Sequence, residues 1–126
     1  MIQFLAPLAL APLMFLQGAP LVDPALPGAA PPMSLEQQAA LRCSAAFALV
    51  AAGQDRGNVA ALEYPPLGQR GKEFFVRSMA QVMDDTGMTR EQVSRLVGQS
   101  AQELRDGNGI GDAMPACLLL LDASGV

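Results

Sequence analysis

Apolar residues recur at helical spacing along most of the chain from position 34 onward. Ser34 and Gln37 have the spacing of a capping box, in which each side chain binds the other residue's backbone N–H at the start of a helix. Beyond Arg42 the stretch is apolar on nearly every side, which is typical of a buried central helix. The pattern predicts such a helix up to a stop at Gly53. Its inner face would consist of Leu35, Ala39, Cys43, Phe47 and Val50.

A less regular segment follows, in which residues 58–63 favour a short helical turn. The segment from Tyr64 to Leu67 should be extended, because each of its two prolines keeps the preceding residue out of the α region. A second long helix is then predicted roughly from Gln69 to Thr86, with Gly87 as its end. Its inner face would consist of Phe75, Met79 and Val82, flanked by Phe74 and Met83.

The next start signal is a second capping box, formed by Thr89 and Gln92. The helix that it opens would turn inward Val93, Leu96, Val97, Ala101 and Leu104, with Gly98 at a close helix crossing. Residues 106–111 contain three glycines and are predicted to form a loop. A last helix, 113–122, would be capped by Asp112 and carry Pro115 in its first turn.

These elements predict an all-α fold, a compact bundle of about four helices. We find no strand-period alternation of useful length and no internal repeat. The side chains at inward positions should be mostly buried, and they are Phe47, Phe75, Met79, Val93, Leu96, Val97, Leu104 and Leu119.

The N-terminal region has a different composition. Residues 2–16 form an apolar run that is too short to span a bilayer and matches the apolar region of a signal peptide. Residues 20–32 contain five prolines, each without an N–H donor, which favours an extended tether. The sequence therefore predicts a signal peptide over 1–19, a proline-rich tether over 20–33 and a helical domain over 34–126. No stable membrane span would remain after the signal is removed.

Other interpretations of this region stay open. No Lys or Arg precedes the apolar run, which indicates either a weak signal or a true start further upstream with a basic segment lost. The alternatives to export are a cytosolic protein that starts at Met33 and a buried apolar N-terminal helix. The proline-rich segment could also be a ligand for an aromatic groove rather than a spacer. Export favours a periplasmic or secreted location.

The two cysteines, Cys43 and Cys117, are the strongest physical clue. An even cysteine count in a small exported domain predicts a disulfide. The alternatives are a pair of buried free thiols or a redox-active pair, although the two residues are far apart in sequence and form no Cys-x-x-Cys unit.

Composition narrows the chemistry further. The 126 residues carry eight basic and twelve acidic side chains, a net charge of −4, which disfavours nucleic acid as a partner. The chain has no histidine, so a Cys₂His₂ zinc site, a Ser-His-Asp triad and a Cys-His dyad are impossible. Asp106, Asn108 and Gly111 match part of an EF-hand loop, but Cys117 stands where the bidentate Glu belongs. We expect no catalytic residues, no metal and no cofactor.

One surface is a candidate for binding another protein. Arg70, Lys72 and Arg77 form a modest basic patch near the second long helix, for which a solvated face is the simpler explanation and an acidic partner surface the alternative. The candidate partner surface comprises Tyr64, Pro65, Pro66, Arg70, Lys72 and Arg77.

Four short segments carry a resemblance to known sequences, and they are 41–47, 64–68, 71–75 and 114–117. On these segments the chain resembles small uncharacterised exported two-cysteine helical proteins of alphaproteobacterial type. The resemblance brings no assigned activity. In size, helicity and paired cysteines the chain is also similar to periplasmic immunity proteins that neutralise secreted effectors, an analogy of class rather than of motif.

Three functions remain after these exclusions. The favoured hypothesis is a non-enzymatic periplasmic interaction protein, a binding or inhibitory, immunity-like scaffold with a protein partner of unknown identity and an oligomeric state that the sequence does not define. The first alternative is a small periplasmic stress chaperone that unmasks apolar surface in acid, which twelve acidic residues and seven methionines make conceivable. The second is an enzyme built on carboxylates, serines or Tyr64.

Export gives the first testable prediction. The mature protein should accumulate in the periplasm with an N-terminus between Ala19 and Ala30, because the signal peptide is removed there. Mass spectrometry of the purified protein measures that N-terminus. An intact start at Met1 or Met33 would contradict export by this signal.

Overall fold

The computed structural model describes residues 33–126, and the predicted signal peptide and residues 20–32 of the predicted tether lie outside the described residues. The described part is all-helical and contains no strand, which confirms the predicted fold class. Its helices are α1 (Leu35–Asp55), α2 (Val59–Leu62), α3 (Gly68–Thr86), α4 (Arg90–Arg105) and α5 (Gly109–Ala123).

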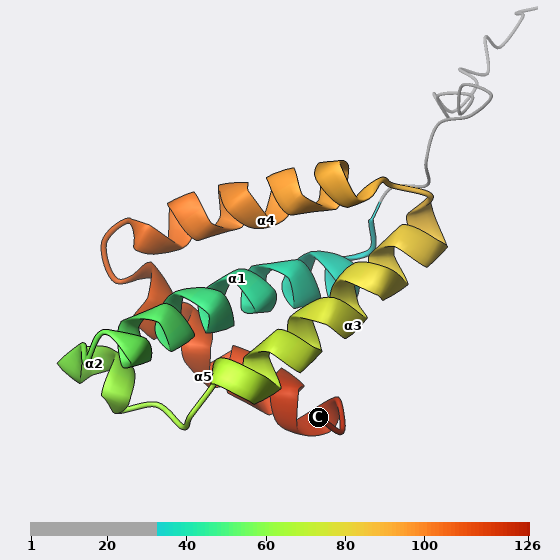
Figure 1. Ribbon diagram of the computed structural model, residues 1–126. Helices are drawn as coiled ribbons and strands as arrows, with labels where there is room; N and C mark the ends of the chain where they lie inside the picture. Colours follow the sequence, from blue (N-terminus) through green and yellow to red (C-terminus); the bar gives the residue numbers. More distant parts are fainter. Residues whose placement is uncertain (1–32) are drawn as a thin grey trace, which may run out of the picture.

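Helix α1 lies in the middle of the bundle, with α3, α4 and α5 arranged around it (Figure 1). Its side chains from Cys43 to Phe47 are all buried, which confirms that this apolar stretch forms the central helix. The prediction for Leu35 is wrong, since this side chain is 83% exposed. Leu35 lies in the first turn of α1 on a side of the helix that faces solvent, as does the exposed Ala39 four residues further along.

Both predicted capping boxes are present. The Ser34 hydroxyl accepts the Gln37 N–H at 3.1 Å, and the Ser34 N–H donates to Gln37 Oε1 at 2.9 Å. Thr89 and Gln92 make the same exchange at 3.2 and 2.8 Å at the start of α4. These reciprocal bonds satisfy backbone donors that the first turn of a helix leaves free.

Two glycines have roles other than the predicted ones. Gly53 does not end α1, which continues to Asp55; a Cβ at Gly53 would lie 2.8 Å from that of Ala61, so its lack of a side chain lets α2 pack closely. The chain turns instead at Gly57, whose φ of 72° favours glycine. Gly98 marks no close crossing, because a Cβ there would meet nothing within 4 Å.

A single amide organises the connection between α2 and α3. The Gln54 side-chain nitrogen lies 3.0 Å from the Ala61 carbonyl, 3.2 Å from that of Tyr64 and 2.9 Å from that of Pro65. Its oxygen accepts the Leu67 N–H at 3.1 Å. Leu67 is fully buried, so this non-helical segment is held firmly in the fold.

Helix α5 begins four residues earlier than predicted, at Gly109, with Asn108 rather than Asp112 at its N-cap. The glycines that indicated a loop allow this start: a Cβ at Gly109 would lie 2.7 Å from the Leu104 carbonyl oxygen of α4. Pro115 therefore lies in the second turn of α5 rather than in the first.

The buried side chains form two clusters. The larger is built around Phe47 of α1, which meets Phe74 of α3 edge to face with ring centroids 5.3 Å apart. The smaller joins Leu41, Val82 and Val93 of α1, α3 and α4. Together they bury side chains from the four long helices.

The predicted core is confirmed in part. Phe47, Val93 and Leu104 are buried as expected. Four expected core residues are half-buried instead, and they are Phe75, Met79, Leu96 and Val97. The prediction for Leu119 is wrong, because it is 73% exposed. The inward positions of α5 are Met114, Cys117 and Leu121, whose spacing places Leu119 on another side of the helix.

The predicted disulfide joins Cys43 and Cys117, with their Cα atoms 5.2 Å apart. It links the middle of α1 to the middle of α5, and both cysteines belong to the larger buried cluster. The bridge closes a loop across a sequence separation of 74 residues. Constraining the unfolded chain over that length contributes about 4 kcal/mol in the chain-entropy model.

Removing the bridge should therefore be costly. We expect Cys43→Ser to lower the free energy of unfolding by about 2–5 kcal/mol and to leave a Cys117 thiol that forms linked dimers under oxidising conditions. Urea denaturation and a non-reducing gel measure the two effects. The Cys43→Ala/Cys117→Ala double variant is the control without a free thiol. An unchanged unfolding midpoint in this variant would show that the bridge does not stabilise the fold.

Two glycines in helices offer a matched pair of alanine substitutions. We expect Gly98→Ala to stabilise the protein by about 0.5–1 kcal/mol, because an exposed helical glycine has open space for a methyl group. Gly53→Ala should be destabilising, because its methyl group would force α2 away from α1. Thermal unfolding of both variants tests the pair, and equal shifts in Tm would contradict the packing described for Gly53.

Candidate functional site

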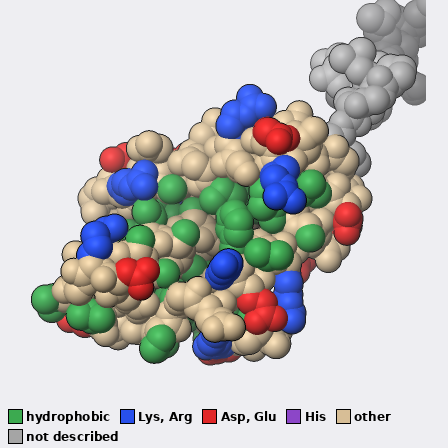
Figure 2. Space-filling model, in the orientation of Figure 1, with side chains coloured by type: hydrophobic (Ala, Val, Ile, Leu, Met, Phe, Trp, Pro, Cys, Tyr) green, Lys and Arg blue, Asp and Glu red, His purple; other side chains and the backbone are tan. Residues whose placement is uncertain are grey.

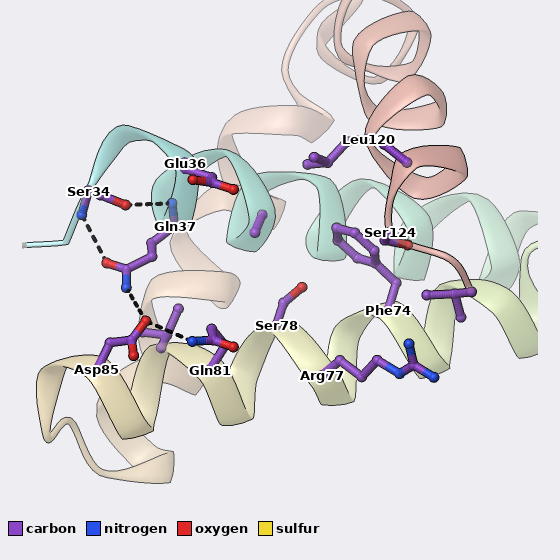
Figure 3. Close-up of a pocket in the computed structure, with 14 residues that line it drawn as sticks. Ser34, Glu36, Gln37, Phe74, Arg77, Ser78, Gln81, Asp85, Leu120 and Ser124 are labelled. Atoms are coloured by element: carbon purple, nitrogen blue, oxygen red, sulfur yellow. Dashed lines mark hydrogen bonds between the residues drawn. The ribbon is translucent and has the colours of Figure 1, made fainter.

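A groove lies between the N-terminal half of α1, α3 and the C-terminal end of α5 (Figure 3). Its volume of about 530 Å³ falls within the range of sites that take small molecules or side chains. The lining is mixed, with apolar side chains at the base and amides, hydroxyls and charged groups at the edge. The residues that line it include Gln37, Ala40, Phe74, Arg77, Ser78, Gln81, Val82, Asp85 and Leu120.

The base of the groove follows one side of α3. Phe74, Ser78 and Val82 are spaced four residues apart and therefore share that side. Phe74 and Val82 are buried, whereas Ser78 is half-buried and directs its hydroxyl into the space between α1 and α3 (Figure 3). Leu120 of α5 completes the base opposite Phe74. The result is an apolar strip with one hydroxyl in its middle.

One end of the groove is held by a network of amides on a carboxylate. Gln37, whose Oε1 completes the capping box of α1, also donates from Nε2 to Asp85 Oδ2 at 3.0 Å. Gln81 donates to the same oxygen at 3.0 Å. Gln37 thereby ties the first turn of α1 to α3 at this end of the groove.

The other end is bounded by arginines of α3. Arg77 pairs with Glu73 at 2.7 Å and lines the groove. Arg70 pairs with Asp122 of α5 at 3.1 Å and donates from Nε to the Val126 carbonyl at 3.1 Å. Because both pairs are exposed, each contributes little to stability. The contacts of Arg70 nevertheless position the end of α5 beside α3.

The structure separates the six residues of the predicted partner surface. Lys72 and Arg77 line one shallow depression on α3, whereas Arg70 is directed toward α5. Tyr64 is half-buried against the larger cluster, with exposed Pro65 and Pro66 beside it. The positive charges of Arg70 and Arg77 are each partnered by a carboxylate, so the sequence alone overstated the basic character of this patch.

The groups in the groove are suited to holding a ligand. Its amides, hydroxyls and guanidinium offer hydrogen bonds above an apolar base. Within residues 33–126, no three His, Cys, Asp or Glu side chains gather as metal ligands would. The partial EF-hand match is divided between two elements, since Asp106 ends α4 and Gly111 lies inside α5.

Sequence reasoning missed most of the groove. The capping box identified Gln37, but not its second hydrogen bond to a residue 48 positions away. Gln81 and Asp85 are four residues apart on α3, so their contact with each other can be predicted from the sequence. The contact of Asp85 with Gln37 of α1 cannot be predicted in this way. Ser78 carries no sequence signal of its own.

Comparison with known proteins does not assign this site. No protein-family model, curated protein or solved structure matches the chain. Among the helices described, none combines the length and apolar character needed to cross a membrane.

Proposed function

We propose that this chain is an exported, non-enzymatic interaction protein that holds a segment of a partner protein in the groove between α1, α3 and α5. The observation that carries the proposal is the groove itself, in which the half-buried Ala40 and Leu120 lie with the buried Phe74 and Val82 beneath hydrogen-bonding side chains. Binding sites for flexible ligands combine these two features, apolar area for affinity and a few polar groups for orientation.

The dimensions of the strip favour a short peptide segment. Eight residues separate Phe74 from Val82, which corresponds to about 12 Å along a helix. An extended chain rises about 3.3 Å per residue, so about four residues would lie along the strip. Their backbone groups need hydrogen-bond partners when buried, and Ser78, Gln81 and Arg77 are placed to offer them.

The covalent link supports the proposed location and mode of action. A disulfide between helices persists in oxidising compartments such as the periplasm. It fixes α5 on α1 and therefore holds one wall of the groove in place before a partner arrives. An inhibitory, immunity-like role agrees with such a preformed site, because an inhibitor acts by occupying its target rather than by chemistry.

The groove can be blocked by a substitution that replaces no fully buried residue. Ser78→Arg would fill the space above Phe74, whereas Ala80→Arg places the same side chain on an exposed part of α3 outside the groove. In pull-downs from periplasmic extract, we expect Ser78→Arg to reduce capture of a specific partner at least tenfold and Ala80→Arg to leave it unchanged.

Circular dichroism should show that both variants keep their helices and Tm. Equal capture by Ser78→Arg and the unmodified protein would place the partner elsewhere on the surface. The absence of any specific partner across growth conditions would contradict the proposal, and suppression of client aggregation in an acid light-scattering assay would then favour the stress chaperone.

A further inference from the structure

A second apolar surface lies on another side of the bundle. α3 and α4 diverge from their connecting turn, with α1 between them (Figure 1). Figure 2 shows hydrophobic side chains gathered in the middle of this face, with Lys and Arg side chains and several Asp and Glu side chains around them. We call it the α3/α4 face and define its apolar part as Phe75, Met79, Met83, Val97 and Ala101.

These residues follow helical spacing on two neighbouring helices. Phe75, Met79 and Met83 are four residues apart along α3, and Val97 and Ala101 are four apart along α4. All five are half-buried. Met79, Met83 and Val97 pack against the cluster of Leu41, Val82 and Val93, which places them on the same part of the molecule.

Helix α1 supplies small side chains between the two helices. Leu41, which belongs to that cluster, is followed on the same side of α1 by Ala45, Ala48 and Ala52. Ala48 is exposed and Ala52 is half-buried, so neither α3 nor α4 fully covers this stripe. A ligand on this face would therefore touch alanines in the middle and longer side chains at both edges.

Three cations without an ion-pair partner among residues 33–126 lie beside this apolar strip. Lys72 precedes Phe75 by three residues and therefore lies on the same side of α3. On α4, Arg90 lies seven residues before Val97, and Arg105 lies four residues after Ala101, so both are near the same side of that helix. In the part of the chain that the structure describes, the ion pairs use Arg42, Arg70 and Arg77, so these three cations have no carboxylate partner. They give this face three cations that are unpaired within the described residues, on a protein whose net charge is −4.

We propose that the α3/α4 face docks an amphipathic helix of a partner protein that carries Asp or Glu along both edges of its apolar side. The partner's apolar side would cover the methionines and alanines, and its carboxylates would meet Lys72, Arg90 and Arg105. Lys72 and Met83 are about 17 Å apart along α3, and Arg90 and Arg105 about 23 Å along α4, which suits a partner helix of about 12–16 residues.

Methionine side chains adapt to partners of differing shape, and an apolar helix face laid between two helices is a common recognition mode. The surface is separate from the groove of the proposed function, since it lies on the side of α3 that bears Phe75 and Met79 rather than the side that bears Ser78 and Gln81. The two sites can therefore succeed or fail independently.

The test uses the protein without its predicted signal peptide. The probe is a fluorescein-labelled 16-residue synthetic peptide that forms an amphipathic helix, with Leu and Met on one side and Glu on both edges of that side. A matched peptide carries Lys in place of Glu. By fluorescence anisotropy, we expect the Glu peptide to bind at least tenfold more tightly than the Lys peptide, with an affinity that falls as NaCl is added.

Charge reversal locates the binding surface. Lys72→Glu and Arg105→Glu should each weaken binding of the Glu peptide several-fold, and the double variant should weaken it more than tenfold. Arg95→Glu is the matched control, because Arg95 lies on α4 five residues from Arg90 and outside this face. Ser78→Arg, which blocks the groove, should leave this affinity unchanged. These substitutions alter exposed or half-buried positions, and circular dichroism verifies that the variants remain folded.

Two results would overturn the proposal. One is a lack of preference for the Glu peptide, seen either as no binding or as equal affinity for the Glu and Lys peptides. The other is binding to phosphatidylglycerol vesicles that depends on Lys72 and Arg105 while the Glu peptide does not bind, which would identify the face as a membrane-surface site instead.

Discussion

The burial of α1 between three other long helices is the constraint on which the rest of the structure depends. Its side chains from Cys43 to Phe47 are enclosed on all sides, so α3, α4 and α5 are each positioned by contact with α1. The Cys43–Cys117 bond makes one of these contacts covalent. Because the core contains few aromatic residues, the edge-to-face pair of Phe47 and Phe74 and this single bridge account for much of what specifies the arrangement.

Both proposed surfaces follow from how the outer helices are attached. α3 and α4 each pack chiefly against α1 rather than against each other, and α5 meets α3 mainly through Arg70 and its partners at one end. The sides of α3 that face these two gaps therefore remain partly uncovered. One side becomes the base of the groove and the other becomes part of the α3/α4 face.

The sequence predicted those elements whose signals are local. Capping boxes at Ser34 and Thr89 and the terminal Gly87 define helix ends through contacts within a few residues, and all three are confirmed. The errors arose where a residue's role depends on a distant neighbour. Gly53 indicated a helix end, but it is needed for the close packing of α2 on α1. The glycines before Asp112 indicated a loop, but the lack of a side chain at Gly109 lets α5 begin there in close contact with α4. The groove was missed for the same reason, since Gln37 and Asp85 meet across 48 residues.

The wrong prediction for Leu119 also shows why the choice of face on α5 needed more than hydrophobicity. Four consecutive leucines, Leu118 to Leu121, give no preferred side by pattern alone. Cys117 resolves the choice, because its bond to Cys43 turns the side with Met114 and Leu121 inward. Leu120 then faces the groove and Leu119 faces solvent. The disulfide thus determines which leucine is available to a ligand. Because such a bond forms in an oxidising compartment, the location expected for the protein also affects the shape of its proposed binding site.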